Sequence, residues 1–285
     1  MTKQLLLIDG NSIVFRAFFA MHNQMDKFTN KDGLHTAAIY GFKLMLDHVL
    51  QNFKPDTALV AFDAGKVTFR TKMYDDYKGG RNKTPNELTE QIPYVRELIK
   101  DSGLHSYELA NYEADDIIGT LAKQADDAGY KTLIVTGDRD LTQLASENTT
   151  VAVTHKGVTD TEHYTPAHVE EKLGITPRQI IDMKALMGDS SDNYPGVTKI
   201  GEKTAIKLVK QFGSVEELYD HIDDLKKSKM KEHLIEDEEI ARQCKTLATI
   251  LRDAPLKIGL DDLQYQGPQT DDLIKFYKEM GFKSF

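Results

Sequence analysis

Aspartates close three apolar runs of the sequence. The runs are residues 5–8, 58–62 and 133–137, and the acids that follow them are Asp9, Asp63 and Asp138. Each run is continuously apolar, which is typical of a strand buried on both faces of a parallel sheet. Because ligands bind at the carboxyl ends of parallel strands, we expect the three acids to gather along one edge of the sheet.

Further acids lie in three clusters. One cluster opens the helix predicted after residue 113, one follows Gly137, and one precedes a glycine-containing turn. Taken alone, each has an ordinary explanation as a helix cap, a complement to the helix dipole or a polar turn. With the strand-end acids the set becomes Asp9, Asp63, Glu113, Asp115, Asp116, Asp138, Asp140, Asp189 and Asp192. Capping alone does not explain so many.

Carboxylates that converge on one place repel one another and resist ionising together. Divalent cations relieve that repulsion, and a ligand set of oxygens alone favours Mg²⁺ or Mn²⁺ over zinc. Two such ions ~4 Å apart suit phosphodiester hydrolysis, because one helps to generate hydroxide and the other stabilises the leaving oxygen. The acids therefore predict a two-metal hydrolytic site.

The net charge of the chain depends strongly on the acids of this predicted site. Lys and Arg number 36, Asp and Glu 45, and the net charge is −9, which by itself argues against a nucleic-acid binder. Setting aside the nine site carboxylates brings −9 to 0, so the objection disappears. The one cysteine, Cys244, excludes an internal disulfide framework and a Cys-rich zinc site, and fits a cytoplasmic protein. No apolar run approaches the ~20 residues of a membrane span, and the N-terminal run lacks a signal-peptide cleavage site.

Two basic segments are candidates for phosphate contacts. Between residues 66 and 83 six bases outnumber two acids, a net of 6 − 2 = +4, with three aromatic residues interleaved. Aromatic rings stack on unpaired bases while cations follow phosphates, although a solvated loop has the same composition. In residues 194–205 two glycines flank a turn before a lysine-rich helix, and such a turn points N–H groups at a phosphate. A plain connection between two helices is the alternative there.

The elements that position these residues follow from periodicity. Strands alternate with amphipathic helices up to about residue 164, which is the α/β pattern. Beyond that point Thr165-Pro166 and Thr176-Pro177 have the form of helix starts, and no convincing strand follows. A length of 285 residues suits two domains at ~150 residues each. We predict an α/β domain at 1–164 and a helical domain at 165–285.

Seven motifs now fall in the order found in one family. They are LLIDGNS from residue 6, AFD from 61, YKGGR from 77, YEADD from 112, TGDRD from 136, MGDSSDN from 187 and PGVTKIGEKTA from 195. With them the chain resembles the 5′-nuclease (flap endonuclease) superfamily, and within it the N-terminal 5′→3′ exonuclease domain of bacterial DNA polymerase I. The resemblance implies a mostly parallel PIN/resolvase-like sheet with flanking helices. It also implies a helical arch at about 66–95 and a helix-hairpin-helix (H3TH) domain.

The resemblance also implies roles for the acids. Asp9, Asp63, Glu113 and Asp115 serve a first Mg²⁺ or Mn²⁺, some of them through water. Asp138, Asp140, Asp189 and Asp192 serve a second, with Asp115 or Asp116 between the two ions.

Further roles concern DNA. Lys78 and Arg81 at the base of the arch hold the scissile phosphate, Arg16 binds another phosphate, and Phe15 and Tyr77 stack near the cleaved nucleotide. Residues 195–205 grip the duplex, often with K⁺ at the turn, through Gly196, Val197, Lys199, Gly201, Lys203 and Thr204. Lys199 departs from the pattern, because many relatives have glycine there, and a positive φ would strain a lysine.

The function so implied is a 5′→3′ exonuclease and flap endonuclease of DNA replication and repair. Its substrates are 5′ flaps and nicked or gapped duplexes, with RNA–DNA hybrids as a further substrate. The expected protein is a monomer of the bacterial cytoplasm, associated with the nucleoid, and a polymerase domain follows in the native chain.

Two other functions share some of these features. A haloacid-dehalogenase-like phosphatase also uses a strand-end aspartate and Mg²⁺, but it needs a second aspartate where Asn11 stands. A DNA-junction binding protein with a weak site needs no catalysis, and the presence of all nine acids argues against it.

Overall fold

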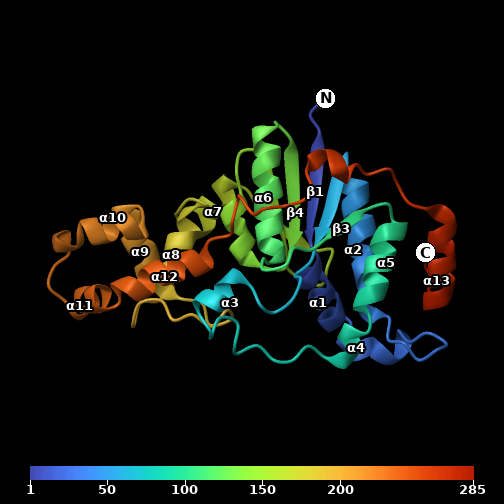
Figure 1. Cartoon of the computed structure of the whole chain (residues 1–285), viewed down its shortest axis with the longest axis horizontal. Coiled ribbons are helices and arrows are strands. Elements are labelled where there is room, and N and C mark those ends of the chain that lie inside the picture. The colour runs from blue at the N-terminus through green and yellow to red at the C-terminus, as the bar shows by residue number, and fades with distance from the viewer.

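A six-stranded sheet forms the centre of the molecule (Figure 1). The computed structural model describes all 285 residues. The strand order is β3-β2-β1-β4-β5-β6, and every pairing is parallel except that of β5 with β6. The strands are β1 (Gln4–Asp9), β2 (Thr57–Ala61), β3 (His105–Tyr107), β4 (Lys131–Thr136), β5 (Thr149–Thr154) and β6 (Thr161–Tyr164).

The three predicted strands, β1, β2 and β4, are adjacent at the middle of this sheet. Their apolar runs are buried on both faces, and Leu5, Leu6, Leu7 and Ile8 are all fully buried. From β1 the chain adds β2 and β3 on one side and later adds β4, β5 and β6 on the other. The order in which the chain adds strands therefore reverses between β1 and β4. At such a switch point a crevice opens at the carboxyl ends of the strands.

Helices cover both faces of the sheet. One face carries α1 (Gly10–Ala20), α2 (Ala37–Phe53), α5 (Ile92–Asp101) and α13 (Thr270–Met280), which share a core with Leu6, Ile8 and Val60. The other face carries α6 (Ala114–Asp127), whose apolar side packs on Leu5 and Leu7. The same core continues without a break from α6 into the helices that follow the sheet.

These later helices extend to one side of the sheet (Figure 1). They are α7 (Pro166–Leu173), α8 (Gln179–Met187), α9 (Glu202–Phe212), α10 (Val215–Asp220), α11 (Lys229–Glu236) and α12 (Glu238–Ala248). No strand follows Tyr164, and Thr165 caps α7 by accepting a hydrogen bond from His168 N at 3.2 Å. Short 3₁₀ helices complete the chain at His22–Lys27, Arg139–Leu144, Ile222–Asp224 and Leu260–Leu263 (η1–η4).

The last helix, α13, does not stay with this group. It packs on α5 at the opposite end of the molecule (Figure 1). Phe276 and Met280 of α13 are buried in the core of the α1/α2/α5 face. The stretch 165–285 is thus helical but does not form one spatial unit, because its apolar last helix finds its cover on the α/β part. The division at 164/165 stays a prediction.

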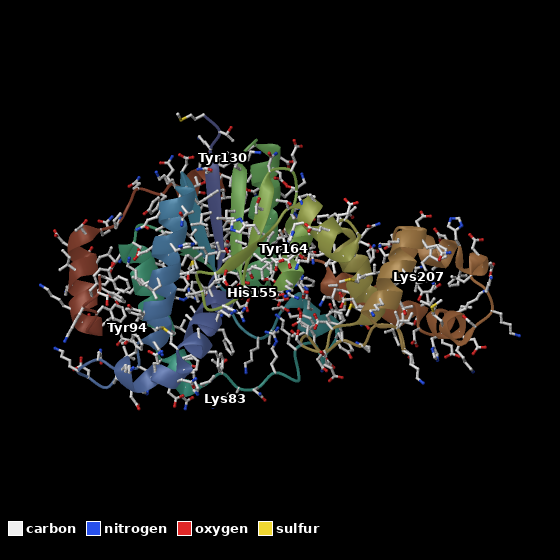
Figure 2. All side chains as sticks on the ribbon, turned by 180° about the vertical axis from the view of Figure 1, so that it is seen from behind. Lys83, Tyr94, Tyr130, His155, Tyr164 and Lys207 are labelled. Atoms are coloured by element: carbon white, nitrogen blue, oxygen red, sulfur yellow. The ribbon has the colours of Figure 1, made fainter.

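The segment predicted as a helical arch is helical only in part. It contains α3 (Phe69–Met73), α4 (Asn86–Thr89) and the start of α5, joined by turns and an extended run. Gly79 and Gly80 lie in these turns and Pro85 in the run, and both residue types disfavour a helix interior. The run passes below the carboxyl ends of the strands (Figure 1), and Lys83 lies on it (Figure 2). No helix of the structure is long and apolar enough to cross a membrane.

Candidate metal centre and nucleic-acid interface

A threonine hydroxyl joins the acids of the two central strands. Thr136 Oγ1, at the end of β4, donates to Asp9 Oδ2 at 2.8 Å and accepts from Asp138 N at 3.0 Å. Asp9 also caps α1 by accepting from Ser12 N at 3.4 Å. The strand-end acids Asp9 and Asp138 therefore belong to one hydrogen-bonded group at the crevice.

The third strand-end acid brings α6 to the same place. Asp63 Oδ1 accepts from Ala114 N, in the first turn of α6, at 2.7 Å, and Asp63 N donates to Asn11 Oδ1 at 2.8 Å. Asp115 is the next residue of that turn and is half-buried. The negative charges of Asp9 and Asp138 both raise the pKa of Asp115, so these three acids lie close together.

Crowding and burial make this first group of carboxylates hard to ionise. Burial, with the charge of Asp63 second, raises the pKa of Asp9 to about 7. Burial, with the charge of Asp9 second, raises the pKa of Asp115 well above its ordinary value. The pKa of Asp138 is also raised by burial, and nearby Asp192 adds to the effect. Such a group gains stability from any cation that enters it.

A second group consists of Asp140, Asp189 and Asp192. Asp140 follows β4, whereas Asp189 and Asp192 follow α8, and one carboxylate oxygen from each lies within 4.8 Å of the others. Burial and the charge of Asp138 raise the pKa of Asp140 to about 7. Lys184 of α8 contacts Asp189 at 2.9 Å and Asp140 at 3.2 Å. Although burial opposes it, Lys184 holds the pKa of Asp189 below its ordinary value.

The chemistry of these donors fits hard divalent cations. Both groups offer carboxylate oxygens and no histidine or cysteine ligand. Mg²⁺ and Mn²⁺ prefer such ligands, and the raised pKa values mark sites where a cation offsets repulsion. The arrangement can thus hold divalent ions at the crevice of the sheet.

Asp116 faces away from both groups, which revises its predicted place among the metal ligands. It is fully buried, and its two oxygens accept from the two Nη atoms of Arg70 at 2.8 Å each. They also accept from Glu113 N at 3.1 Å and Leu251 N at 3.0 Å. Neighbouring helix residues project about 100° apart, and these hydrogen bonds hold Asp116 on the side of Arg70 and Leu251.

Glu113 lies between the acids and the cations. Its carboxylate pairs with Arg70 at 2.5 Å and with Lys78, and it accepts from the Tyr77 hydroxyl at 3.2 Å. Burial favours the neutral form, but Lys78 and then Arg70 outweigh it and lower the pKa of Glu113. An ionised Glu113 is therefore already part of an ion-pair network.

The two cations predicted to hold the scissile phosphate connect the two acid groups. Lys78 pairs with Glu113, and its backbone N donates to Asp192 O at 2.8 Å. Arg81 Nη2 lies 2.6 Å from Asp192 Oδ1, and its side chain remains 52% exposed. Both cations therefore lie at the rim of the site, where an incoming phosphate can reach them.

The remaining predicted contacts divide into exposed and buried residues. Phe15 is exposed and contacts Phe19, with ring centroids 5.0 Å apart. Arg16 donates to the carbonyls of Thr154 at 2.7 Å and His155 at 3.0 Å. Its guanidinium is thereby tied to the turn that follows β5.

Tyr77 differs from its expected role as a base-stacking residue. It is 6% exposed, its ring stacks on Tyr194 at 6.5 Å, and its hydroxyl bonds Glu113. A ring covered in this way offers no face to a nucleotide. Its contacts instead support Glu113.

The helix-hairpin-helix turn exposes its lysines and buries its apolar residue. Lys199, Gly201 and Lys203 are exposed and Thr204 is half-buried, while Val197 is buried and donates through its N to Leu186 O at 2.8 Å. Gly196 has φ +65°, and a Cβ there would lie 2.2 Å from Gly188 N. Lys199 has φ +58°, which glycine adopts more readily. Lys207 lies on the same helix, α9, at the side of the molecule (Figure 2).

Sequence reasoning missed three residues of the site. Thr136 joins two strand-end acids, Lys184 pairs with two others, and Arg70 was counted only as one base of the 66–83 segment. The burial of Arg70 depends on partners distant in the chain, and no local pattern reveals it.

Comparison with known proteins identifies the family of this chain. Residues 4–174 match the family model described as 5′-3′ exonuclease, N-terminal resolvase-like domain. Residues 175–271 match the one described as 5′-3′ exonuclease, C-terminal SAM fold. The chain belongs to the 5′-3′ exonuclease family. Members of this family are nucleases, so the chain is a hydrolase of phosphodiester bonds.

Relatives of this 5′-3′ exonuclease include bacterial DNA polymerases I. It is 60% identical over 281 residues to DNA polymerase I of Streptococcus pneumoniae (strain ATCC BAA-255 / R6). The aligned region covers 99% of this chain and 32% of that protein. It is 54% identical over 282 residues to DNA polymerase I of Bacillus subtilis (strain 168), with the same coverage. The chain thus spans about a third of the length of these relatives.

Solved structures agree on the fold. T5 5′-exonuclease with bound zinc ions superposes with a TM-score of 0.75 at 23% identity, over 98% of both chains. The catalytic core of Rad2 in complex with DNA superposes with a TM-score of 0.60 at 16% identity, over 98% of this chain and 89% of that one. The chain therefore has the T5 exonuclease fold, a mostly parallel sheet with a helical part.

Proposed function

We propose that this 5′-3′ exonuclease is structure-specific and hydrolyses phosphodiester bonds at 5′ ends and at flap junctions of DNA with two divalent ions. One observation carries the proposal. Acids from separate segments of the chain converge at the crevice between β1 and β4, beside the rim cations Lys78 and Arg81. Clustered carboxylates next to a half-buried lysine and an exposed arginine suit a phosphodiester better than a neutral substrate.

The metal ligands proposed form two sets. Asp9, Asp63, Glu113 and Asp115 would hold a first Mg²⁺ or Mn²⁺. Asp138, Asp140, Asp189 and Asp192 would hold a second, and Asp116 is left out because Arg70 occupies both its oxygens. When bound, the ions activate water and stabilise the charge that develops on the phosphate and the leaving oxygen.

The protein's own residues orient the phosphate. Lys78 and Arg81 now neutralise Glu113 and Asp192, and both can turn to a phosphate that enters between them. Their charges then stabilise the negative charge that grows on the phosphate oxygens. Hydrolysis breaks the bond between phosphorus and O3′, which leaves a 5′-phosphate on one product and a 3′-hydroxyl on the other.

The substrate is proposed to bind mainly through its backbone. The turn at residues 195–205 and the lysines of α9 would hold the duplex, with K⁺ at the turn, and contacts of this kind fix position without reading sequence. Arg16 would bind a phosphate, and the exposed ring of Phe15 would stack on a base. The T5 and Rad2 neighbours are described with metal ions and with DNA, which supports the same partners here.

The wider setting follows from the relatives. Because they are bacterial DNA polymerases I, we place the activity in replication and repair on the nucleoid in the cytoplasm, with a polymerase domain in the native chain. Flapped, nicked and gapped DNA are the proposed substrates, and RNA–DNA hybrids a further one, since selection depends on shape and end. The nuclease part is proposed to act as a monomer.

A cleavage assay tests the proposal. The substrate is a 5′-labelled flapped duplex with Mg²⁺, and the variant carries both Asp115→Ala and Asp138→Ala. Cleavage should be lost, while binding of the same DNA in Ca²⁺ should remain within about threefold, because the phosphate contacts persist. Asp223→Ala, a fully exposed acid far from the crevice, is the control and should cleave at the wild-type rate. A double variant that still cuts at that rate would falsify the metal assignment.

A further inference from the structure

Arg70 is a buried arginine whose guanidinium makes hydrogen bonds from all three of its nitrogens. The residue is 2% exposed. Nη1 donates to Glu113 at 2.5 Å and Asp116 at 2.8 Å, and Nη2 donates to Asp116 at 2.8 Å. Nε donates to Leu247 O at 3.1 Å, and Nη2 also donates to Thr249 O at 2.7 Å. An arginine saturated in this way cannot touch DNA.

These acceptors belong to two helices from different parts of the chain. Leu247 is in the last turn of α12, and Thr249 follows that helix, so Arg70 satisfies carbonyls that the helix end leaves free. Glu113 and Asp116 lie at the first turn of α6. The guanidinium thus joins the negative end of one helix to the acidic start of another, and both favour a cation.

The chain that follows α12 continues along α6. We call residues 247–254 the strap. Leu251 N donates to Asp116 Oδ1 and Ala254 N donates to Thr120 Oγ1, both at 3.0 Å. A Cβ on Gly119 of α6 would lie 2.5 Å from Leu251 O, so only glycine allows the strap to pass this close. The strap is therefore fitted to the first two turns of α6.

The contact of Arg70 with the end of α12 also affects the second acid group, because α12 packs beside the helix that precedes two of its acids. α12 packs along α8, and Asp189 and Asp192 follow the end of α8. Glu113 and Asp115, in contrast, are carried by α6. The relative position of these two pairs of acids depends on how α12 sits against α6, and Arg70 is the charged contact at that junction.

We propose that Arg70 is a positioning residue of the nuclease. It sets α12, and with it the acids after α8, in register with the acids of α6, and it does so through the fork of its guanidinium together with Asp116. The inference rests on the proposed function, since it concerns the acids assigned there to divalent ions.

The geometry of the fork makes Lys the informative substitution. Lys keeps the charge, but its ammonium is a single point that cannot bond two carboxylates and two carbonyls on separate elements. Arg70→Lys therefore keeps the positive charge but loosens the contact between α12 and α6, which the strap alone then maintains. Asp116→Asn should act in the same direction, because an amide nitrogen in place of one oxygen faces an arginine donor.

The experiment measures Mg²⁺ affinity by calorimetry and then kcat and KM on a flapped duplex, at a temperature where each variant is shown to be folded. For Arg70→Lys we expect Mg²⁺ to bind about 5- to 20-fold more weakly and kcat to fall about 10- to 100-fold, with KM for DNA within about threefold, as misplacement by ~1 Å predicts. Raising Mg²⁺ should recover part of the lost kcat. The double variant with Asp116→Asn should lose little more than either single variant.

Arg252→Lys is the matched control. Arg252 lies on the same strap and anchors to the same helix through Gly119 O at 3.0 Å, but it touches none of the acids proposed as ligands. We expect a lower melting temperature with Mg²⁺ affinity and kcat within about twofold of wild type, since its loss removes one hydrogen bond.

The outcomes separate the two proposals. If folded Arg70→Lys keeps the wild-type Mg²⁺ affinity and kcat, Arg70 is structural only and the inference is wrong. If KM rises while kcat holds, Arg70 contacts DNA and the inference is wrong as well. If the wild type binds Mg²⁺ but does not cut flapped DNA, the proposed function fails, and the change in Mg²⁺ affinity still decides the role of Arg70.

Discussion

The two acid groups at the crevice differ in how their charge is compensated. The first, Asp9, Asp63, Asp115 and Asp138, accepts hydrogen bonds chiefly from backbone amides and from the Thr136 hydroxyl, with no direct ion pair. The second, Asp140, Asp189 and Asp192, is paired with Lys184 and Arg81. One group therefore concentrates unpaired negative charge, whereas the other already holds cations of the protein.

This difference shows how the same ligand type produces two kinds of site. An ion that enters the first group relieves repulsion among carboxylates that have no ion pair of their own, and only Glu113, proposed as a further ligand of that ion, is paired with Lys78 and Arg70. An ion that enters the second must share its ligands with a lysine and an arginine, or displace them. We therefore expect tighter binding at the first group and easier exchange at the second.

The largest effect on activity is expected from a substitution of Asp115, which belongs to the first group. Asp115→Asn removes a charge that no arginine or lysine can replace, and we expect kcat on flapped DNA to fall by at least about a thousandfold. Asp127→Asn, at an exposed position of the same helix, should keep the wild-type rate. Retention of more than a tenth of the activity by Asp115→Asn would mean that the first group does not hold the essential ion.

The next effect concerns pH in the absence of divalent ions. The pKa of Asp9 and of Asp140 rises from an ordinary 3.8 to about 7 in the folded protein. The folded state then binds more protons than the unfolded state between these values, so stability should fall as the pH rises from about 4 to 7 and level off above. Melting curves in EDTA measure this, and Mg²⁺ should raise the melting temperature more at pH 8 than at pH 5. A stability that rises steadily over that range contradicts the crowding described.

Lys184 tests the second group. Lys184→Met leaves Asp140 and Asp189 without their shared cation, and we expect the metal-free protein to lose about 1–2 kcal/mol, reduced from a fully buried pair because Lys184 is partly exposed. Saturating Mg²⁺ should shrink that loss, since the ion supplies the missing charge. Lys172→Met, at an exposed pair with Glu162, should cost little with or without Mg²⁺. Chemical denaturation of each variant and the wild type, with and without Mg²⁺, gives the four changes in the free energy of unfolding.

The smallest effect is expected at the hairpin turn, away from both groups. Lys199 adopts φ +58°, so Lys199→Gly relieves strain and should stabilise the protein by about 0.5–1 kcal/mol. The lost charge should also make DNA binding slightly less salt-dependent, by up to about one unit of the log–log slope. A lower melting temperature for this variant would show that the backbone at Lys199 is not strained.

Much of the fold was predictable from the sequence because three strands are long apolar runs. β1, β2 and β4 were found for that reason, and so was the meeting of Asp9 and Asp138, which follows from parallel strands. β3 has only three residues, β5 has only three apolar residues between threonines, and β6 is a polar edge strand, so none shows such a run. The partial helicity of the arch could have been suspected from Gly79, Gly80 and Pro85.

The site was less predictable, for a physical reason. Asp115 and Asp116 are indistinguishable by type and position, and only the burial of Arg70 decides which of them faces the crevice. That burial depends on Leu247 and Thr249, more than 170 positions along the chain. Tyr77 is covered by Tyr194 for the same kind of reason. A family pattern assigns roles by residue, whereas the exposure of a side chain depends on distant neighbours.

The strap also bears on the order in which the protein is made. Until residues 247–251 have been synthesised, Arg70 and Asp116 lack part of their hydrogen-bond partners, and the first turns of α6 stay uncovered. Contacts this distant in sequence form late in folding. A nascent chain therefore contains all the acids of both groups before the contacts that align α12 with α6 can form.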